Sequence, residues 1–377
     1  MTAIGIIGCG KIAERHILAY RKLPVRIIIA DASPDVARSL ADQYRVEYRE
    51  NPEDILADTE ITATDICVPT ACHREMIIRS LAGGKHCFCE KPLCGTLREA
   101  KEIREAAARS DRVLMVGFLQ RFHPAFRVVK EALDSGAIGT PYLSLFRVGG
   151  RGNAATWKHQ RATSGGVVLE LLVHKLDQIV WFFGPPERVD VLVGETLRPI
   201  RTVHGQTISA DAEDLVVLDM QARGTRVICE ADFITPSYMD HMEIQGENGS
   251  IFSSLLHFMP TIIHCNERRG IYNQGSNFQN FPMVNLFELE LAHFLQVIES
   301  KVQNTNSLQD SIYVTVIIER IWDSLNRFGP PGGQRWDAGR TAIDSADTRQ
   351  PERGGDHRDY RGFEIGQPSG GPLLPEV

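Results

Sequence analysis

The sequence feature that most limits the possible folds is a glycine turn near the N-terminus, between a short apolar run and a helical pattern. The apolar run covers residues 3–8, and the helical pattern reaches Lys22. The turn between them, Gly8-Cys9-Gly10-Lys11-Ile12-Ala13, has the form G-x-G-x-x-A, in which the first glycine makes the turn and the second lets a pyrophosphate approach the backbone. The alanine permits close helix packing, and the helix N-terminus would face the phosphates. We therefore predict a dinucleotide site at Gly8, Cys9, Gly10, Lys11 and Ile12.

The second apolar run, residues 25–30, ends in an aspartate that bears on the choice of cofactor. Asp31 lies about where a carboxylate accepts hydrogen bonds from the ribose hydroxyls. A carboxylate there would repel a 2′-phosphate, and the nearest downstream arginine is Arg38, so the sequence favours NAD over NADP. The alternative for Asp31 is a turn or a helix N-cap before Ser33-Pro34.

Strand and helix patterns continue to alternate as far as about residue 117. This order indicates parallel strands joined by helical crossovers, that is, an α/β Rossmann domain with a doubly wound sheet. Ligands of such sheets bind at the carboxyl ends of the strands, where Pro69, Thr70, Glu90 and Lys91 fall. The later predicted strands are 63–68, 86–89 and 112–117, and the predicted helices are 35–43, 74–82 and 97–108.

The pattern changes after about residue 120. A polar loop over 149–164 precedes a helical stretch over 166–183, and later segments alternate as in an antiparallel sheet. We therefore expect an α+β domain with a large, open, mostly antiparallel sheet. Its predicted strands are 142–148, 188–194, 213–220, 225–232, 241–246, 250–255 and 261–266, and its other helices are 124–135, 286–301 and 308–326.

These patterns divide the chain into three predicted parts. Residues 1–120 form the dinucleotide-binding domain, and residues 121–328 form a domain for substrate binding and oligomerisation. The last helix of the second domain is a candidate to pack back on the first. Residues 329–377 are rich in glycine and proline and lack a periodic apolar pattern, so we predict a flexible tail.

The composition excludes several classes of partner. Of the 377 residues 43% are hydrophobic and 24% are charged, which is ordinary for a globular protein, and the net charge of −7 offers no footprint for nucleic acid or anionic membrane. A small molecule is therefore the expected partner. The chain has no apolar run of membrane-spanning length and no signal-peptide pattern at its start, so we expect a cytoplasmic protein.

The eight cysteines predict neither disulfides nor a metal site. Several lie inside apolar strand-like runs, where a free thiol behaves as a small hydrophobic group. The residues His86, Cys87, Cys89 and Cys94 are metal-ligand types close in sequence. However, Cys87 and Cys89 would share one strand face while His86 points to the other, and no second ligand pair is evident, so we predict no metal.

Two segments contain candidate catalytic groups. Lys91 ends a predicted strand and is followed by a proline, and a lysine in such a crevice needs a partner or a chemical role; we interpret it as a proton-handling residue. In the segment 165–177, helical spacing places Glu170, His174 and Asp177 along one stripe of a helix built mainly of Val and Leu. A histidine can accept an alcohol proton near neutral pH, and a neighbouring carboxylate fixes its tautomer. The alternative for His174 is a hydrogen-bonded residue of the core.

Taken together, these motifs resemble the Gfo/Idh/MocA family of NAD(P)-dependent oxidoreductases. The resemblance covers roughly residues 1–328 and rests on four segments in order: the glycine turn, Val68-Pro69-Thr70 with His73, Gly84 to Pro92 with its Glu90-Lys91-Pro92 signature, and the helical segment Gly165 to Asp177. Members have a Rossmann domain and a second domain whose open sheet often forms an oligomer interface. Most oxidise or reduce a hydroxyl or ketone on a sugar, a nucleotide sugar or a cyclitol.

The resemblance implies roles for individual residues. Lys91 matches the catalytic lysine of the family, and His174 matches the histidine that serves as acid and base in many members. Glu170 stands where the pattern commonly has aspartate, and Asp177 matches an aspartate that is either catalytic or orients the histidine. The nicotinamide would lie near the strand ends, with cofactor contacts at Pro69, Thr70, His73, Glu90 and Lys91. In the oxidation direction, His174 would take the hydroxyl proton while Lys91 stabilises the developing alkoxide.

The substrate wall is predicted from Lys91, His174 and a group of aromatic and cationic residues. An aromatic face suits a sugar ring, and cations suit a phosphate or carboxylate. The alternatives are a solvated basic loop and, for the arginine near the domain junction, a structural ion pair. The candidates are Arg121, Arg151, Trp157, Lys158 and Arg161.

The prediction is therefore an NAD-preferring dehydrogenase or ketoreductase, assembled as a homodimer or homotetramer through the second sheet. One alternative is NAD-dependent glycoside cleavage through a transient ketone, in which substrate is consumed without net NADH. Another is a non-catalytic regulator that senses the cofactor. The presence of Lys91 and His174 argues against the regulator.

Overall fold

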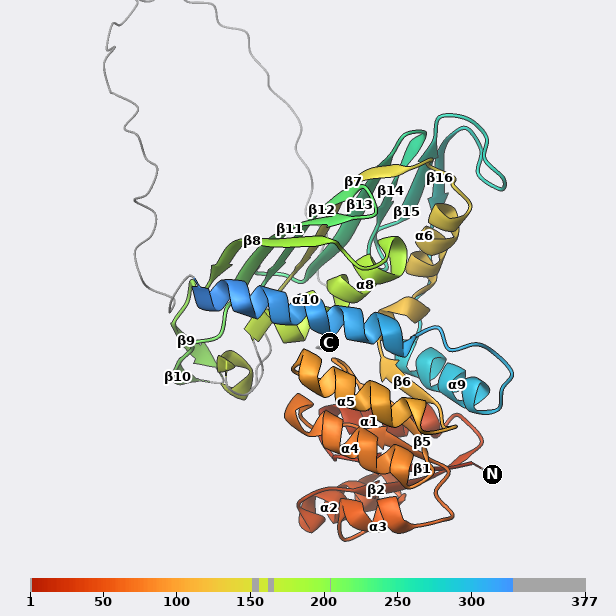
Figure 1. Cartoon of the computed structure of the whole chain (residues 1–377), viewed down its shortest axis with the longest axis vertical. Coiled ribbons are helices and arrows are strands. Elements are labelled where there is room, and N and C mark those ends of the chain that lie inside the picture. The colour runs from red at the N-terminus through yellow and green to blue at the C-terminus, as the bar shows by residue number, and fades with distance from the viewer. Residues whose placement is uncertain (1, 151–155, 162–165, 204, 328–377) are drawn as a thin grey trace, which may run out of the picture. The chain divides into compact units, whose positions relative to one another are not determined.

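The computed structural model describes residues 2–150, 156–161, 166–203 and 205–327 (Figure 1). All of them belong to one compact unit, Met1–Gly333. The predicted tail, 329–377, lies outside the described residues. None of the described helices is both long enough and apolar enough to span a bilayer.

The first sheet is parallel and confirms the Rossmann prediction. Its strand order is β3-β2-β1-β4-β5-β6, so the sheet grows in opposite directions from the junction of β1 and β4. Ligands of doubly wound sheets bind outside the strand ends at such a junction. The strands are β1 (Thr2–Ile7), β2 (Val25–Ala30), β3 (Glu47–Tyr48), β4 (Ala63–Ile66), β5 (His86–Glu90) and β6 (Leu114–Gly117).

Helices cover both faces of this sheet. Side chains alternate along β1, so that Ile4 and Ile6 pack in one apolar cluster while Ala3 and Ile7 pack in another. A strand that is buried on both faces has a continuous apolar sequence, which is why residues 3–8 could be predicted to form a strand. The helices are α1 (Lys11–Tyr20), α2 (Pro34–Tyr44), α3 (Pro52–Ala57), α4 (Thr70–Ala82) and α5 (Leu97–Ala108).

The second sheet is mixed and mostly antiparallel, as predicted. Its order is β16-β15-β14-β13-β7-β12-β11-β8, and of the described strand pairs within this sheet only β7–β12 is parallel. The strands are β7 (Pro141–Gly149), β8 (Arg188–Glu195), β11 (Leu215–Ala222), β12 (Thr225–Asp232), β13 (Met239–Gly246), β14 (Gly249–Ser253), β15 (Thr261–Cys265) and β16 (Gly275–Gln279).

Helices contact this sheet on one face. In β7, Ser144, Phe146 and Val148 are buried, whereas Leu145 on the opposite face is exposed. Figure 1 shows α10, in blue, beside the sheet, and α10 also contacts α5 of the first sheet's layer. The helices that contact this sheet are α6 (Pro124–Asp134), α8 (Val173–Phe183) and α10 (Leu308–Arg327). The remaining helix, α9 (Leu286–Ile298), contacts α1 of the first sheet's layer and η1.

Short and irregular elements account for the differences from the predicted elements. The helix predicted over 166–183 is α-helical at 166–167, passes through a π-helical turn, η3 (Val168–Leu172), and continues as α8. The small β9 (Ile200–Val203) and β10 (Gln206–Ser209) hairpin, β3 and β16 were not predicted, because their few residues carry no clear apolar alternation. Two 3-10 turns, η1 (Leu119–Phe122) and η2 (Thr156–His159), complete the fold.

Candidate active site

The glycine turn has the geometry that a dinucleotide requires. Gly8 has φ +99°, and a Cβ atom on it would lie 2.6 Å from the Cys67 carbonyl oxygen. Gly10 precedes α1, and a Cβ atom on Gly10 would have no described neighbour within 4 Å. The backbone at the start of α1 is therefore open to a phosphate group, which the N–H groups at a helix N-terminus favour. These residues fit the pyrophosphate of NAD.

Asp31 makes the contacts of a turn residue, which was the alternative to its predicted role in binding the ribose. One carboxylate oxygen accepts the Cys9 N–H at 2.8 Å, and the other accepts the Ser33 N–H at 2.9 Å. Each oxygen keeps a further lone pair, so the predicted contact with the ribose stays a prediction. A cavity of about 350 Å³ beside this turn is lined in part by Glu14 and Asp35, whose carboxylates disfavour a 2′-phosphate.

The segment after β4 combines accessible residues with a buried histidine. Pro69 is exposed and Thr70 is half-buried at the start of α4, where a cofactor can reach them. His73 is buried, and its Nδ1 and Nε2 lie 2.8 Å and 2.9 Å from the carbonyl oxygens of Pro92 and Val68. The His73 ring thus joins the turn after β4 to the turn after β5.

Lys91 reaches across to the helix that carries the second predicted group. Its Nζ donates hydrogen bonds to the carbonyl oxygens of Leu169 at 3.1 Å and Glu170 at 3.5 Å, both in the π-helical turn η3. The Lys91-Pro92 peptide bond is cis. The structure therefore brings together Lys91 and the Glu170 segment, which are 79 residues apart in the sequence.

The side chains around Lys91 differ in their charge. Burial alone would raise the pKa of Glu170, but Lys91 and Lys158 hold it below its usual value, and the Lys158 ammonium pairs directly with the Glu170 carboxylate. His174 is half-buried in the first turn of α8. Burial, followed by the charges of Lys91 and Lys175, lowers the pKa of His174 well below 6.5. His174 is therefore neutral at pH 7 and able to accept a proton.

Asp177 contacts an arginine rather than His174. No described residue is a hydrogen-bond partner of His174 Nδ1. Asp177 accepts hydrogen bonds from Arg121 Nη2 at 2.6 Å and Nε at 3.0 Å, and Arg121 Nη1 also donates to Asp310 at 2.9 Å. Arg121 is only 1% exposed, so its guanidinium makes the structural ion pair that was its alternative interpretation. The reason is geometric: Asp177 follows His174 by three residues on α8, and its side chain faces η1, which carries Arg121, and α10, which carries Asp310.

The basic loop is only partly described. Lys158 reaches the site through Glu170. Arg161 lies farther along, where its backbone N–H donates to Asp211 at 2.8 Å and its Nη2 lies 3.8 Å from Glu213. Arg151 and the Trp157 side chain lie outside the described part of the chain.

Sequence reasoning missed a buried group behind Lys91. His16 of α1 lies between two carboxylates, with Nδ1 2.8 Å from Asp65 of β4 and Nε2 3.1 Å from Glu90 of β5. The second oxygen of Glu90 accepts the Lys91 N–H at 3.0 Å. The available signal was Asp65, an acid inside the predicted apolar strand 63–68. His16 was hidden because α1 reads as an ordinary amphipathic helix.

One cluster of potential metal ligands occurs within the described ranges, and it includes this histidine. His16, Asp65 and Cys67 place ligand atoms within 4.8 Å of one another. Both ring nitrogens of His16 lie within hydrogen-bond distance of carboxylate oxygens, so a ring that donates to both has no lone pair for an ion.

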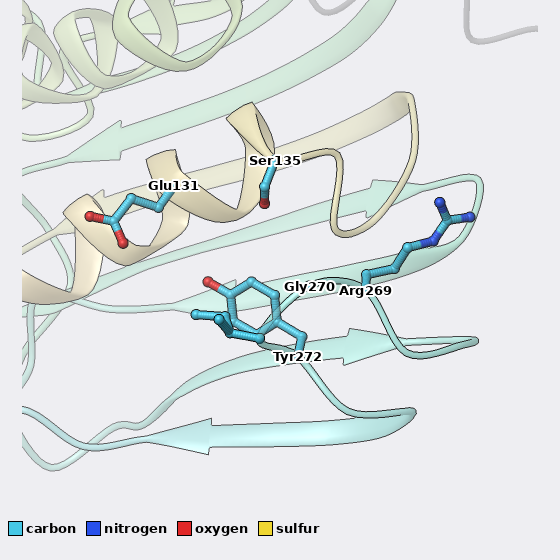
Figure 2. A pocket seen from close by; sticks show the side chains of 6 residues that line it. Glu131, Ser135, Arg269, Gly270 and Tyr272 are labelled. Carbon is cyan, nitrogen blue, oxygen red and sulfur yellow. The ribbon is translucent and has the colours of Figure 1, made fainter.

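A separate cavity of about 260 Å³ lies between the end of α6 and the loop before β16. Figure 2 shows Glu131 and Ser135 on the helix and Arg269 and Tyr272 on the loop side. It contains none of the residues predicted to bind substrate or cofactor.

Comparison with known proteins agrees with this arrangement. Residues 2–118 match the model "Oxidoreductase family, NAD-binding Rossmann fold", and residues 126–252 match the GFO/IDH/MocA C-terminal domain. Levoglucosan dehydrogenase in complex with NADH has the same fold, with a TM-score of 0.78 and 24% identity over 86% of this chain and 97% of that chain.

The chain is also similar to two inositol dehydrogenases and a further oxidoreductase. Inositol 2-dehydrogenase of Burkholderia ambifaria is 30% identical over 65% of this chain and 72% of its own length. Myo-inositol 2-dehydrogenase of Thermotoga maritima is 26% identical over 81% of this chain and 88% of its own. The uncharacterized oxidoreductase YrbE of Bacillus subtilis is 34% identical over a segment that makes up 48% of this chain. The same segment covers 53%, or about half, of YrbE. With both domains matched in order, this chain belongs to the Gfo/Idh/MocA family of NAD-binding oxidoreductases.

Proposed function

We propose that this protein is an NAD-dependent dehydrogenase that transfers a hydride between the cofactor and a hydroxyl or ketone carbon of a sugar, a nucleotide sugar or a cyclitol. The observation that carries the proposal is the contact of Lys91 Nζ with the carbonyl oxygens of the turn that bears Glu170. This contact joins the cofactor sheet to the helix of His174. The inositol and levoglucosan dehydrogenases among the relatives support a polyhydroxylated substrate.

The cofactor would be held by the residues around the glycine turn. The open backbone from Gly8 to Ile12 suits its pyrophosphate, Asp31 suits a ribose, and Pro69 and Thr70 lie accessible at the next strand end. Bound NAD supplies the hydride acceptor at this edge of the sheet. The acidic surroundings of Asp31 favour NAD over NADP.

The protein's own residues then handle the proton and the charge. His174 is neutral and has a free Nδ1 within the described structure, so it can take the proton of the reacting hydroxyl. Lys91 places a positive charge where the alkoxide develops. Glu170 and Lys158 form an ion pair beside them, which offers both an acceptor and a donor to further substrate hydroxyls.

A substrate screen tests this function directly. Purified protein with NAD or NADP would be mixed with inositols, sugars including levoglucosan, sugar phosphates and nucleotide sugars, while NADH absorbance is followed. We expect reduction of NAD with at least one polyol and slower reduction of NADP. NADH binding without turnover on the whole panel would contradict the proposal.

We also propose that the protein is a homodimer or homotetramer that pairs through the uncovered face of the eight-stranded sheet. Leu145 and Phe278 are exposed there, at 38% and 65%. Light scattering after size exclusion should give an oligomer that Leu145→Lys dissociates, whereas Leu18→Lys, at an exposed position of α1, should not. A monomeric wild-type protein would contradict it.

Two further parts of the proposal concern organisation and location. We propose that the two sheets are a cofactor domain and a substrate domain divided near residue 120, as the family matches to 2–118 and 126–252 suggest. We also propose a cytoplasmic location, which the eight free cysteines support because thiols stay reduced there. Subcellular fractionation tests the location.

A further inference from the structure

His16 is the one side chain that links the cofactor helix to the Lys91 turn through hydrogen-bonded charges in the described site. It projects from α1 and is fully buried, with Asp65 on one ring nitrogen and Glu90 on the other. A carboxylate accepts hydrogen bonds, so a ring that serves both must donate from both nitrogens and is an imidazolium. Glu90 in turn accepts the backbone N–H of Lys91.

The surroundings of the ring favour this charged form. Burial alone would lower the pKa of His16, but the opposing charge of Asp65 and the contact with Cys67 leave it well above 6.5. The other groups that face it are Glu90 and the Phe88 ring from β5, and Glu290 and the Phe287 ring from α9. Tyr20, on the same helix, lies near Asp65 and Glu290. Burial raises the pKa of Glu290 well above its usual value, which disfavours a further negative charge beside the ring.

We propose that His16 is a positioning residue for Lys91: its doubly hydrogen-bonded ring fixes the Glu90 carboxylate, which holds the Lys91 backbone so that the ammonium reaches the π-helical turn. The inference deepens the proposed function of the same site. It also has a mechanical consequence, because α1 presents the glycine turn at its start and His16 between one and two turns later. The phosphate site and the catalytic lysine are thus held by one helix.

The chemistry of a single substitution shows what the ring contributes. His16→Gln keeps a donor group but loses the charge and one of the two simultaneous hydrogen bonds. Two buried carboxylates then lie without a cation between them, which disfavours the present positions of Glu90 and Asp65. The Lys91 backbone is released, and its ammonium leaves the carbonyl oxygens of Leu169 and Glu170.

Amine labelling measures this release without any substrate. The full chain would be treated with an acetylating ester, and the labelling rate of each lysine followed by peptide mass spectrometry. Lys85 is the internal reference, because it is 3% exposed, lies just before β5 and donates to the carbonyl oxygens of Asp58 and Ile61. In His16→Gln we expect Lys91 to label severalfold faster while Lys85 is unchanged. His257→Gln, at an exposed position, should change neither rate.

Kinetics provide the second readout. With a substrate from the screen, kcat of His16→Gln should fall about tenfold or more, because a small misplacement of a catalytic group is costly. The Kd for NADH should stay close to that of the wild type, since the glycine turn is untouched. A fall in affinity with unchanged kcat would contradict a role in positioning Lys91.

A double variant covers the case in which His16→Gln does not fold. In His16→Gln/Asp65→Asn a neutral amide replaces one of the two unpaired buried carboxylates, so folding no longer has to bury two unpaired charges. Glu90 still lacks its cation in this protein. We expect fast Lys91 labelling and low kcat to persist in this protein. Equal acceleration at Lys85 and Lys91, or wild-type labelling at Lys91, overturns the proposal. If Lys91→Ala keeps full activity, the proposed function fails, whereas the labelling result still decides the role of His16.

Discussion

The cofactor side and the substrate side of the candidate site differ in how completely their polar groups are used. On the cofactor side, both nitrogens of His73 and both nitrogens of His16 lie within hydrogen-bond distance of oxygen atoms. On the substrate side, His174 Nδ1 has no partner among the described residues. Buried polar groups are normally paired, so an unpaired one at a site marks a place for a ligand.

This difference indicates that one half of the site is complete before ligands bind and the other is completed by the substrate. Preorganised groups need no rearrangement at the moment of reaction. Lys91 belongs to the first half by its backbone and to the second by its ammonium. Substitutions in the two halves should therefore have separable effects, which the following predictions use.

The largest effect is expected for Lys91→Ala. Removing the ammonium takes away the charge that stabilises the alkoxide, so kcat should fall by more than about 100-fold. The Kd for NADH should change little, because Gly8 to Ile12 are unaffected. Stopped-flow or steady-state absorbance and NADH fluorescence measure the two quantities. Lys130→Ala, at an α6 surface position that pairs with Asp134, is the control and should match the wild type.

His174→Gln should reduce kcat by about 100-fold through loss of the proton acceptor. The pH profile sharpens the assignment. Because the pKa of His174 is lowered well below 6.5, its neutral form persists as the pH falls through that value. In the wild type, kcat/KM for oxidation should therefore show no loss from this group until the pH is well under 6.5. A decline centred at or above 6.5 would mean that His174 is not held neutral as described.

A smaller effect is expected for Lys158→Met, which keeps the length of the side chain and removes its charge. The Glu170 carboxylate would lose its ion-pair partner, and a substrate hydroxyl would lose a donor. Loss of one charge-assisted hydrogen bond corresponds to a rise in KM of about tenfold. Initial rates across substrate concentrations measure it. An unchanged KM would place Lys158 outside the substrate contacts.

The smallest effect on turnover is expected for Asp177→Asn. Asp177 contacts Arg121 and not His174, so kcat should change by less than about threefold if the carboxylate only supports the fold. Stability should fall by about 3–5 kcal/mol, because the buried arginine loses part of its partner. Denaturant unfolding measures the second quantity. A loss of kcat comparable with that of His174→Gln would restore Asp177 to the catalytic group.

The two halves of the site were also unequally visible in the sequence. Residues 3–13 and Val25 to Asp31 could be interpreted because the strand, the turn and the helix follow one another locally. The pairing of Lys91 with the Glu170 segment was accessible only through the family resemblance, since it joins distant segments. The Arg121–Asp177 and His16–Asp65–Glu90 contacts could not be deduced, because charges inside apolar patterns reveal their partners only after folding.

The π-helical turn has a consequence for how such a site can change. An α-helix rotates by about 100° per residue, so the one extra residue of a π turn shifts the direction of every side chain that follows it. Deletion of one residue within Val168–Leu172 would leave α8 equally long yet turn His174 away from Lys91. Loss of a single residue would therefore present a different face of α8 to Lys91, and only the present face carries His174.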